Sequence, residues 1–538
     1  MPVSPSLADA GSRARHFSIV LWLLGAVLIA CAAIFVLMTR HWPMVQDAAL
    51  LHYDVFLIQH GWAPYRDFVD INMPGAYWAT ALAMHLPDQP DVAWRIFDLA
   101  LVALTGVGYY FIARPYSRFA ALFATVLLLL VHGQDGVQQA GQRDLVIAVL
   151  LILAFACLLE AVRRNRWVYL IPFGIGVGVA ATIKPTADPL GVLLLAIVVI
   201  YRARVQDADR SATLGWLAAG LGAMTVPLIA MLLWLRHKGA LKAWIAVEHL
   251  VLPYYATLER RPLGFTFLHS ISPVAVLVVF WLLCLMLRGP HWPPFERLLT
   301  ATAVVVNLGG LLLQGKALPY QRYPMLVFLL LLVAVDLSTA WARREETRRL
   351  ASVAASYVAL GGLCCGSLVI APLALARVDR FVAKPQEFDA MLAADLRRVN
   401  GGDVSGRVQC LDTVEDCLPT LNALRLLPAT GILSDQPLFD PVPRPAVDVF
   451  RQRFQREITA RPPLVFVAVS GYFLDSGSGY RKLDTWPAFQ HWLDSNYTLA
   501  AERSSPGMVR WWSRPQPQPG YRLYVLKGTP TQLGAESR

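Results

Sequence analysis

Long apolar runs, separated by short polar loops, fill the first two thirds of the chain. We place about eleven runs that have the length of a bilayer-spanning helix or fall just short of it. They cover residues 17–39, 95–113, 117–132, 145–162, 167–183, 187–201, 212–235, 265–287, 298–313, 324–342 and 350–376. The fifth run contains Gly174, Gly176 and Gly178, and we expect them to break its helix, as happens where a span lines a cavity. The pattern predicts a polytopic α-helical membrane protein.

The pattern changes to mixed polar and apolar residues after residue 376. The segment "PPLVFVAVS" (462–470) is typical of a buried strand, and "GYRLYVLK" (520–527) predicts another. Between them, "WPAFQHWLDSNY" (486–497) has its apolar residues at helical spacing. We therefore expect two domains, a transmembrane module over residues 1–376 and a small soluble α/β domain over residues 377–538.

The composition agrees with a membrane protein. Hydrophobic residues make up 56% of the chain, charged residues only 16%, and the mean hydropathy is +0.47, whereas about a quarter of a soluble domain is charged. The formal net charge of +11 would suit a nucleic-acid-binding protein. Most arginines, however, lie in short clusters between apolar runs, as the positive-inside rule requires of cytoplasmic loops. We therefore exclude nucleic acid as a partner.

The first apolar run sets the expected orientation. Arg13 and Arg15 precede it, it is too long for the apolar core of a signal peptide, and no cleavage site follows it. We expect an uncleaved first helix with a cytoplasmic N-terminus, and alternate loops show a modest excess of Lys and Arg on that side. An odd number of spans then places the C-terminal domain outside. For a multi-pass protein of a bacterial inner membrane, that side is the periplasm.

Cysteine usage fits this placement. Five cysteines fall in predicted spans, namely Cys31, Cys157, Cys284, Cys364 and Cys365. The other two, Cys410 and Cys417 in "CLDTVEDC", lie in the outer domain, where an oxidising compartment favours a disulfide. Two free thiols are the alternative, whereas the spacing does not match a zinc or thioredoxin site. We predict a structural disulfide between Cys410 and Cys417.

The loop over residues 40–94 is far longer than most other loops, which is typical of a loop with a function of its own. Asp47 lies just beyond the first span. From Asp47 to His60 the apolar residues recur at helical spacing, and we expect an amphipathic helix at the membrane interface. Its polar face would present Asp47, His52 and Asp54 to a cavity.

A second part of this loop, "PYRDFVDINMPGAYW" (64–78), places Arg66, Asp67 and Asp70 among prolines and aromatic rings. Two interpretations stay open, contact with a substrate or a local salt-bridge network that fixes the loop. We expect Asp67 to pair with Arg66. Asp70, which precedes an apolar turn, is the better candidate for substrate contact.

Cations gather on outer loops, the side that the positive-inside rule leaves poor in them. The candidate substrate-binding residues are Arg66, Arg143, Lys184, Arg260, Arg261, Lys316, Tyr320 and Arg322. Structural interpretations also stay open, because Lys184 could extend from a helix end to the membrane surface and Arg143 could pair with Asp144. We interpret Asp98, near a helix end, as interfacial or paired. Together the cations indicate an anionic partner at the bilayer surface.

Carboxylates beside cations on an outer surface suit one reaction, the transfer of a sugar from a polyprenyl phosphate. A carboxylate would deprotonate or orient the hydroxyl of the acceptor, an effect worth about 10²–10⁴-fold in rate. Arginine and lysine side chains would hold the phosphate as its charge grows. The reaction requires no nucleotide and no obligatory cofactor, and it is compatible with a divalent cation.

The order "QDAALLHYD…HGWAPYRDFVDINMPGAYW" resembles the GT-C superfamily of membrane glycosyltransferases, which includes the aminoarabinose transferases and protein O-mannosyltransferases. The resemblance implies that Asp47 is the catalytic carboxylate of the first outer loop. It aligns Asp70 with a glutamate that precedes Lys-Pro in the aminoarabinose transferases, and it places "KALPYQRYP" near the donor phosphate. Two departures, Asp47-Ala48 for Asp-Glu and "INMPG" for Lys-Pro, prevent us from carrying over either family's acceptor.

The sequence thus predicts an inverting membrane glycosyltransferase of the GT-C type. It would move a sugar from a polyprenyl-phosphate donor to a lipid, glycan or protein acceptor on the outer face, with Asp47 as general base and Asp70 as a second acidic contact. The outer domain would bind the acceptor or shield the cavity. Two alternatives stay open: a lipid-linked sugar transporter or flippase, and a non-catalytic cell-envelope assembly protein.

Overall fold

The computed structural model describes residues 7–86, 89–205, 209–287, 292–342, 350–378, 385–412, 417–471, 479–504, 508–511, 514–517 and 519–533. The chain forms two compact units. The first, here called the helical unit, comprises Met1–His41, Arg95–Ile229 and Arg261–Arg380. The second, here called the mixed unit, comprises Trp42–Trp94, Ala230–Arg260 and Phe381–Arg538.

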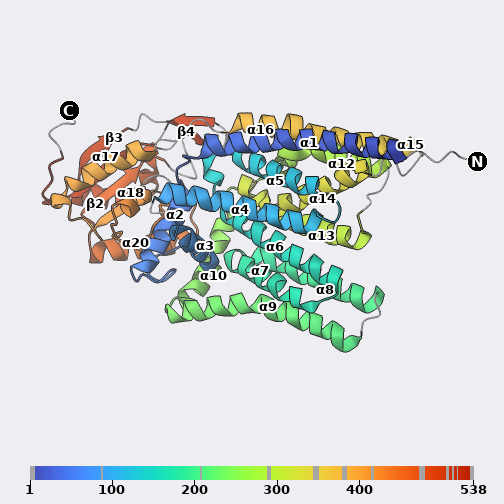
Figure 1. The fold of residues 1–538 in the computed structure, drawn as a ribbon. Helices are drawn as coiled ribbons and strands as arrows, with labels where there is room; N and C mark the ends of the chain where they lie inside the picture. The colour runs from blue at the N-terminus through green and yellow to red at the C-terminus, as the bar shows by residue number, and fades with distance from the viewer. Residues whose placement is uncertain are drawn as a thin grey trace, which may run out of the picture. The chain divides into compact units, whose positions relative to one another are not determined.

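The helical unit consists of long apolar helices that lie side by side in Figure 1. They are α1 (Leu7–Thr39), α4 (Pro90–Ala113), α5 (Arg118–Gly133), α6 (Arg143–Arg164), α7 (Leu170–Ile183), α8 (Asp188–Val205), α9 (Arg210–His237), α11 (Leu263–Ile271), α12 (Ala275–Leu287), α13 (Pro294–Gln314), α14 (Tyr323–Ala342), α15 (Leu350–Cys364) and α16 (Ala371–Arg377). A π-helical stretch, Cys365–Ile370, joins the last two. Helix α14 packs against α5, α6, α13 and α15 and forms the centre of the unit. Apart from Asp336, which pairs with Arg297, and a few hydroxyl groups, its residues are apolar on all sides, as burial among other helices requires.

Nine helices in the described part of the chain are long and apolar enough to cross a membrane. Two shorter apolar helices, Arg118–Gly133 and Trp167–Ile183, coincide with predicted runs at 117–132 and 167–183. The prediction of a polytopic α-helical membrane protein is confirmed. The number of eleven spans stays a prediction.

The prediction of a broken helix at the three glycines is wrong, because α7 runs without interruption from Leu170 to Ile183. Gly174 and Gly178 instead let α9 approach closely, whereas Gly176 faces α6. A Cβ atom on Gly174 would lie 2.6 Å from the carbonyl oxygen of Gly220, and one on Gly178 would lie 2.3 Å from the carbonyl oxygen of Met224. Small residues at such contacts allow two helix backbones to pack together inside a membrane.

The mixed unit contains a four-stranded sheet with the order β1-β2-β6-β3. Its strands are β1 (Val408–Leu411), β2 (Val465–Val469), β3 (Tyr497–Arg503) and β6 (Tyr521–Leu526), and a separate hairpin joins β4 (Met508–Trp511) to β5 (Arg514–Pro517). Strands β1 and β2 are parallel, whereas β6 is antiparallel to both of its neighbours. The two strands predicted from sequence correspond to β2 and β6. The predicted helix is α21 (Pro487–Asn496), so the α/β character of the C-terminal domain is confirmed.

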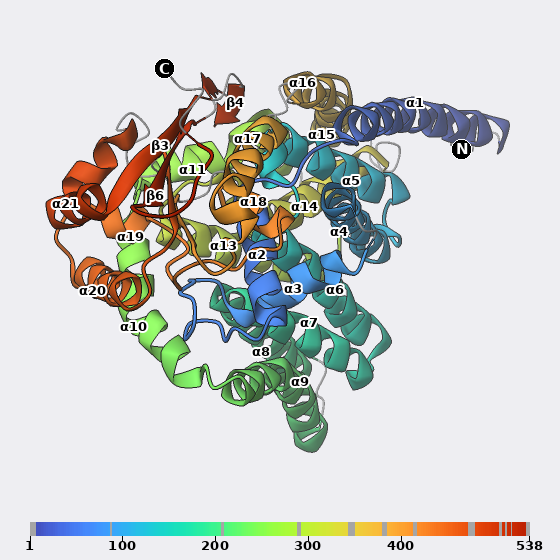
Figure 2. The same ribbon diagram turned by 90° about the vertical axis from the view of Figure 1, so that its left-hand side faces the viewer.

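Helices cover both faces of this sheet (Figure 2). On one face, Val465 and Val467 of β2 pack with α17 (Pro385–Arg397), α18 (Cys417–Ala423) and α2 (Asp47–Gln59) in a single core. On the other face, Phe466 contacts Phe454 of α20 (Pro445–Ala460) and Phe489 of α21. Alternate residues of a strand point to opposite faces, so a continuous apolar run such as β2 needs cover on both.

Helix α2 therefore belongs to the core of the mixed unit. Its place at a membrane interface stays a prediction. The side chains of His52 and Asp54 are only 2% and 0% exposed, so they do not form an open polar face. Helix α3 (Pro74–Met84) packs beside α2. The predicted division at residues 1–376 and 377–538 stays a prediction. In the mixed unit, the first loop folds with the C-terminal residues.

The structure joins Cys410 of β1 to Cys417 of α18 by a disulfide, the pair that the sequence predicts. The bond ties the sheet to the helix that covers it. The five remaining cysteines are free thiols.

Candidate active site

Asp70 lies in the mixed unit at the end of an irregular segment and just before α3, which begins at Pro74. Its Oδ1 accepts hydrogen bonds from the backbone N–H of Ile71 at 2.7 Å and from Nδ2 of Asn72 at 2.9 Å. Its Oδ2 accepts a hydrogen bond from the hydroxyl of Tyr77 at 2.8 Å. The carboxylate is therefore held in one orientation by three donors.

Tyr65 and Tyr77 near Asp70 are buried, Tyr255 is half-buried, and all three are neutral. Burial, with the negative charge of Asp70 as the second cause, raises the pKa of Tyr65 and of Tyr77 well above the usual value. Burial likewise raises the pKa of Tyr255, with the Asp70 charge again the second cause. A neutral phenol donates a hydrogen bond to a carboxylate, which Tyr77 does, whereas the hydroxyl of Tyr65 donates to the carbonyl oxygen of Asn72.

Arg66 and Asp67 form the ion pair that the sequence predicts. Nε of Arg66 lies 2.8 Å from Oδ1 of Asp67, and Oδ2 of Asp67 also accepts a hydrogen bond from the backbone N–H of Ala63 at 2.7 Å. The hydrogen bond from Arg66 is the largest cause of a lowered pKa for Asp67. The pair closes a local turn, which supports the structural interpretation of these two residues, while their contact with a substrate stays a prediction.

Asp47 is the first residue of α2 and is partly exposed. A carboxylate there is favoured by the partial positive charge of the helix N-terminus. Gln46, directly before it, has φ 54° and ψ −127°, a conformation that a residue with a side chain rarely adopts.

Backbone strain of this kind concentrates beside the predicted site residues. Seven non-glycine residues in the described part of the chain have positive φ. Four of them adjoin predicted site residues, namely Gln46, Tyr65, Glu259 and Ala317, which neighbour Asp47, Arg66, Arg260 and Lys316. Such residues cost of order 1–3 kcal/mol each and cluster at functional sites. The distribution supports a functional role for these loops.

In the helical unit, Lys184 pairs with Asp144. The distance from Nζ of Lys184 to Oδ1 of Asp144 is 2.9 Å, and the carboxylate is buried while the ammonium group is partly exposed. Arg143 begins α6 one residue earlier. Asp144 thus has an ion pair with Lys184, and the pairing of Arg143 with Asp144 stays a prediction. Phosphate contact by Lys184 stays a prediction.

The remaining predicted residues of the helical unit are Arg261, Lys316, Tyr320 and Arg322. The backbone N–H of Arg261 donates to the carbonyl oxygen of Gly315 at 2.6 Å, so Arg261 contacts the residue that precedes Lys316. Tyr320 and Arg322 lie in the short helix Pro319–Arg322, and Arg322, only 2% exposed, forms an ion pair with Asp135. Arg322 is thus a buried, paired cation.

A buried network in the helical unit was not predicted from sequence. Oδ1 of Asp98 lies 3.0 Å from Nε2 of His132 and accepts a hydrogen bond from the backbone N–H of Gly141 at 2.7 Å, and Oδ2 pairs with Arg95. Nδ1 of His132 lies 2.8 Å from the hydroxyl of Tyr323. The prediction that Asp98 is paired is confirmed. The one signal for His132 was its place at the end of a predicted span, where a polar residue needs a partner.

The structure therefore distributes the predicted residues over the two units. Asp47, Arg66, Asp70 and Arg260 belong to the mixed unit. Arg143, Lys184, Arg261, Lys316, Tyr320 and Arg322 belong to the helical unit. Their catalytic and binding roles stay predictions. In the described part of the chain, no group of three or more His, Cys, Asp or Glu side chains could hold a metal ion.

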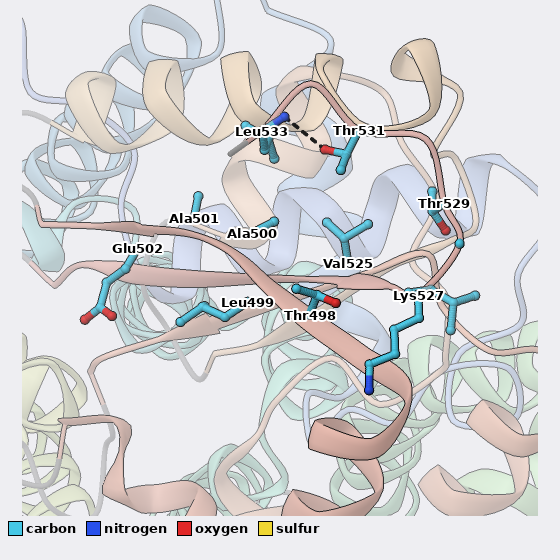
Figure 3. Close-up of a pocket in the computed structure, with 12 residues that line it drawn as sticks. Thr498, Leu499, Ala500, Ala501, Glu502, Val525, Lys527, Thr529, Thr531 and Leu533 are labelled. Carbon is cyan, nitrogen blue, oxygen red and sulfur yellow. Dashed lines mark hydrogen bonds between the residues drawn. The ribbon is translucent and has the colours of Figure 1, made fainter. Parts of the chain in front are cut away.

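Figure 3 shows a pocket of about 560 Å³ at the edge of the sheet, lined by β3, β6 and the segment that follows β6. Its charged groups have protein partners. Nζ of Lys527 binds the carbonyl oxygens of Asp494 and Ser495 at 3.1 and 2.7 Å, and Glu502 pairs with Arg522 at 3.0 Å. The remaining lining is threonine hydroxyls, a glycine and apolar groups, and the pocket contains none of the predicted site residues, so we do not place the reaction there.

Comparison with known proteins gives a family model that matches part of the chain and a shared fold. The model of the dolichyl-phosphate-mannose-protein mannosyltransferase family matches residues 72–234. No curated protein sequence matches the chain.

Several solved structures share the fold at low sequence identity. ArnT from Cupriavidus metallidurans in the apo state has a TM-score of 0.57 and 15% identity, and the match covers 94% of this chain and 98% of that one. The same protein bound to undecaprenyl phosphate has a TM-score of 0.54 and 14% identity, with 93% and 98% covered. The oligosaccharyltransferase from Archaeoglobus fulgidus in the apo form has a TM-score of 0.53 and 11% identity, with 82% and 69% covered. The resemblance predicted from sequence is confirmed, and the chain is a polytopic membrane protein with the fold of the GT-C glycosyltransferase superfamily.

Proposed function

We propose that this protein is a glycosyltransferase that moves a sugar from a polyprenyl-phosphate donor to an acceptor hydroxyl on the outer face of the membrane. The observation that carries the proposal is the fold shared along 93% of the chain with ArnT bound to undecaprenyl phosphate, a polyprenyl phosphate. The match to a dolichyl-phosphate-mannose-protein mannosyltransferase model supports the same donor class. The donor is then an anionic lipid headgroup, which explains why cations were retained on loops beside apolar helices.

Asp47 is the proposed general base. The acceptor oxygen attacks the anomeric carbon, its proton passes to the Asp47 carboxylate, and the bond from the anomeric carbon to the phosphate oxygen breaks. The lipid phosphate leaves with the electron pair, and the configuration at carbon inverts. Asp47 suits this role because it is partly exposed at a helix start beside a strained residue.

Asp70 is the proposed second acidic contact. Three donors already fix its carboxylate, which favours an orienting role toward sugar hydroxyls over the uptake of a proton. Arg66, Arg143, Lys184, Arg260, Arg261, Lys316, Tyr320 and Arg322 are the proposed contacts of the headgroup. Lys184 would then exchange part of its interaction with Asp144 for the phosphate. Each charge-assisted contact in a dry site contributes a few kcal/mol to the stabilisation of the leaving phosphate.

The experiment uses the full chain in nanodiscs with a panel of sugar-loaded polyprenyl monophosphates and a membrane extract as acceptor source. Release of the bare lipid phosphate is followed for the wild type, for Asp47→Asn and for Asp403→Asn. The last is a matched control, because Asp403 is an exposed aspartate of the C-terminal domain.

We expect Asp47→Asn to lower the release rate by about 10²–10⁴-fold while lipid binding persists, and Asp403→Asn to behave as the wild type. Equal rates for wild type and Asp47→Asn would remove Asp47 as the base. A wild type that binds the lipids but consumes none would overturn the transferase proposal and favour transport. Absence of both binding and turnover would favour an assembly role.

A further inference from the structure

The segment over residues 64–73, here called the acidic loop, pairs directly with the C-terminal domain. The backbone N–H of Val69 donates to the carbonyl oxygen of Gly431 at 2.9 Å, and Val69 forms a parallel bridge with Ile432. Asp70 is the next residue along the chain. The backbone that leads into Asp70 is therefore held as a very short strand against the segment between α18 and α19 (Gln436–Phe439).

Two side chains of helix α20, Arg453 and Glu457, form hydrogen bonds with both paired segments. Nη2 of Arg453 donates to the carbonyl oxygens of Arg66 and Asp67 at 3.0 and 3.1 Å. Nε of Arg453 donates to Oε1 of Glu457 at 2.7 Å, and Oε2 of Glu457 accepts from the backbone N–H of Gly431 at 2.8 Å. One Arg–Glu pair thus binds both partners of the backbone pairing at once. Hydrogen bonds to charged groups are the stronger kind in proteins.

Gly431 is required by the closeness of the two segments. A Cβ atom at this position would lie 2.0 Å from the carbonyl oxygen of Asp67 and 2.6 Å from Nη2 of Arg453. Real Cβ atoms do not approach a backbone oxygen so closely, so any side chain here would push the acidic loop away from the domain.

The segment that receives the acidic loop is itself anchored at both ends. At its start, the hydroxyl of Tyr53 donates to the carbonyl oxygen of Leu426 at 2.9 Å. At its end, Asp435 forms an ion pair with Lys482 at 2.6 Å, and both side chains are fully buried. The acidic loop is therefore fixed to a rigid part of the domain, and a rigid support is what a reacting group needs to keep its geometry.

We propose that Arg453, Glu457 and Gly431 are positioning residues that hold Asp70, so that the C-terminal domain sets the geometry of the acidic loop. The inference rests on the proposed function, because it assigns these residues to a transfer reaction. They do not touch the reacting atoms. They act through the backbone of residues 66–69, which precedes the Asp70 carboxylate.

The test compares Arg453→Met with Arg456→Met in the full chain. Both arginines lie on α20, but Arg456 is exposed and its described hydrogen bond is to Gln452 of its own helix. The first measurement is hydrogen exchange of the peptide over residues 64–73, which needs no substrate. The second is kcat and KM for the donor that the wild type consumes.

For Arg453→Met we expect exchange in this peptide to be at least about tenfold faster, since two hydrogen bonds to a charged group are lost. We also expect kcat to fall about tenfold or more with little change in the donor KM, because misplacement removes stabilisation of the transition state alone. Arg456→Met should match the wild type in both measurements. Gly431→Ala should reproduce the effect of Arg453→Met by steric means, and Arg453→Lys should restore part of the turnover.

Unchanged exchange in Arg453→Met would overturn the inference, and so would faster exchange with unchanged kcat. If the wild type consumes no donor, the proposed function fails and the positioning role in catalysis fails with it. The exchange data remain informative in that case, since they report whether Arg453 holds the loop. The two failures are therefore distinguishable.

Discussion

Asp389 of the C-terminal domain has a raised pKa, whereas an aspartate in a folded protein more often has a lowered one. It lies on α17, and burial raises the pKa of its carboxyl group to about 6, from 3.8. A hydrogen bond from Oγ1 of Thr420 at 2.7 Å opposes the shift, and the charge of Asp91 adds to it. We predict that Asp389→Asn stabilises the domain at neutral pH.

The magnitude follows from the two pKa values. Between pH 4 and pH 6 the native state holds a proton that the unfolded state releases, so the free energy of unfolding falls as the pH rises. Above pH 6 the carboxylate is charged in both states, and its burial lowers the free energy of unfolding by about 3 kcal/mol. At pH 4 the same difference is only about 0.6 kcal/mol. Asparagine has nearly the same shape and no charge to bury, so it should recover most of this loss.

Hydrogen exchange of the most protected amides of α17 measures the effect in the full chain. At pH 7.5 we expect those amides to exchange about a hundredfold more slowly in Asp389→Asn than in the wild type, and at pH 4 only a few-fold more slowly. Asp403→Asn, at an exposed position, controls for the loss of charge. Equal exchange in variant and wild type at pH 7.5, or a difference that does not shrink toward pH 4, would refute the assignment of a buried carboxylate.

Two further predictions concern packing and a buried ion pair. Lys482→Met should lower the free energy of unfolding of the C-terminal domain by about 3–5 kcal/mol, because the buried Asp435 loses its ammonium partner. Denaturant unfolding measures this loss of stability. Recovery of stability in a double variant with Asp435→Asn would show that the unpaired charge causes the loss. Gly178→Val should separate α7 from α9, since a Cβ there would lie 2.3 Å from the carbonyl oxygen of Met224. We expect a lower midpoint of thermal unfolding in detergent. Gly215→Val is the control and should have little effect, because a Cβ at that position meets nothing within 4 Å.

Much of the fold follows from the sequence, because it depends on local pattern. Runs of apolar residues long enough for a bilayer predict helices wherever they occur, and the two shorter helices also lie where predicted. Strand β2 and helix α21 were recognisable from composition and periodicity, which are properties of the segment itself. The ion pair of Arg66 with Asp67 joins neighbours in sequence, and the disulfide of Cys410 closes a short loop.

Only the tertiary structure decided which residues each apolar or charged side chain contacts. The helical pattern of α2 indicated that one face is buried, but not that the sheet of a domain more than three hundred residues later covers it. The glycines of α7 signalled a special backbone, and only the position of α9 showed close packing in place of a break.

The candidate site shows the same division. Its acidic and basic residues were identified from their type and their place on predicted outer loops. Three sets of contacts were not identified from sequence: the ion pair of Lys184 with Asp144, the network around Asp98, and the hydrogen bonds from Arg453 to the acidic loop. Each of these contacts joins residues far apart in sequence. A sequence read by itself records which groups need partners, whereas the folding of the chain decides which partner each group finds.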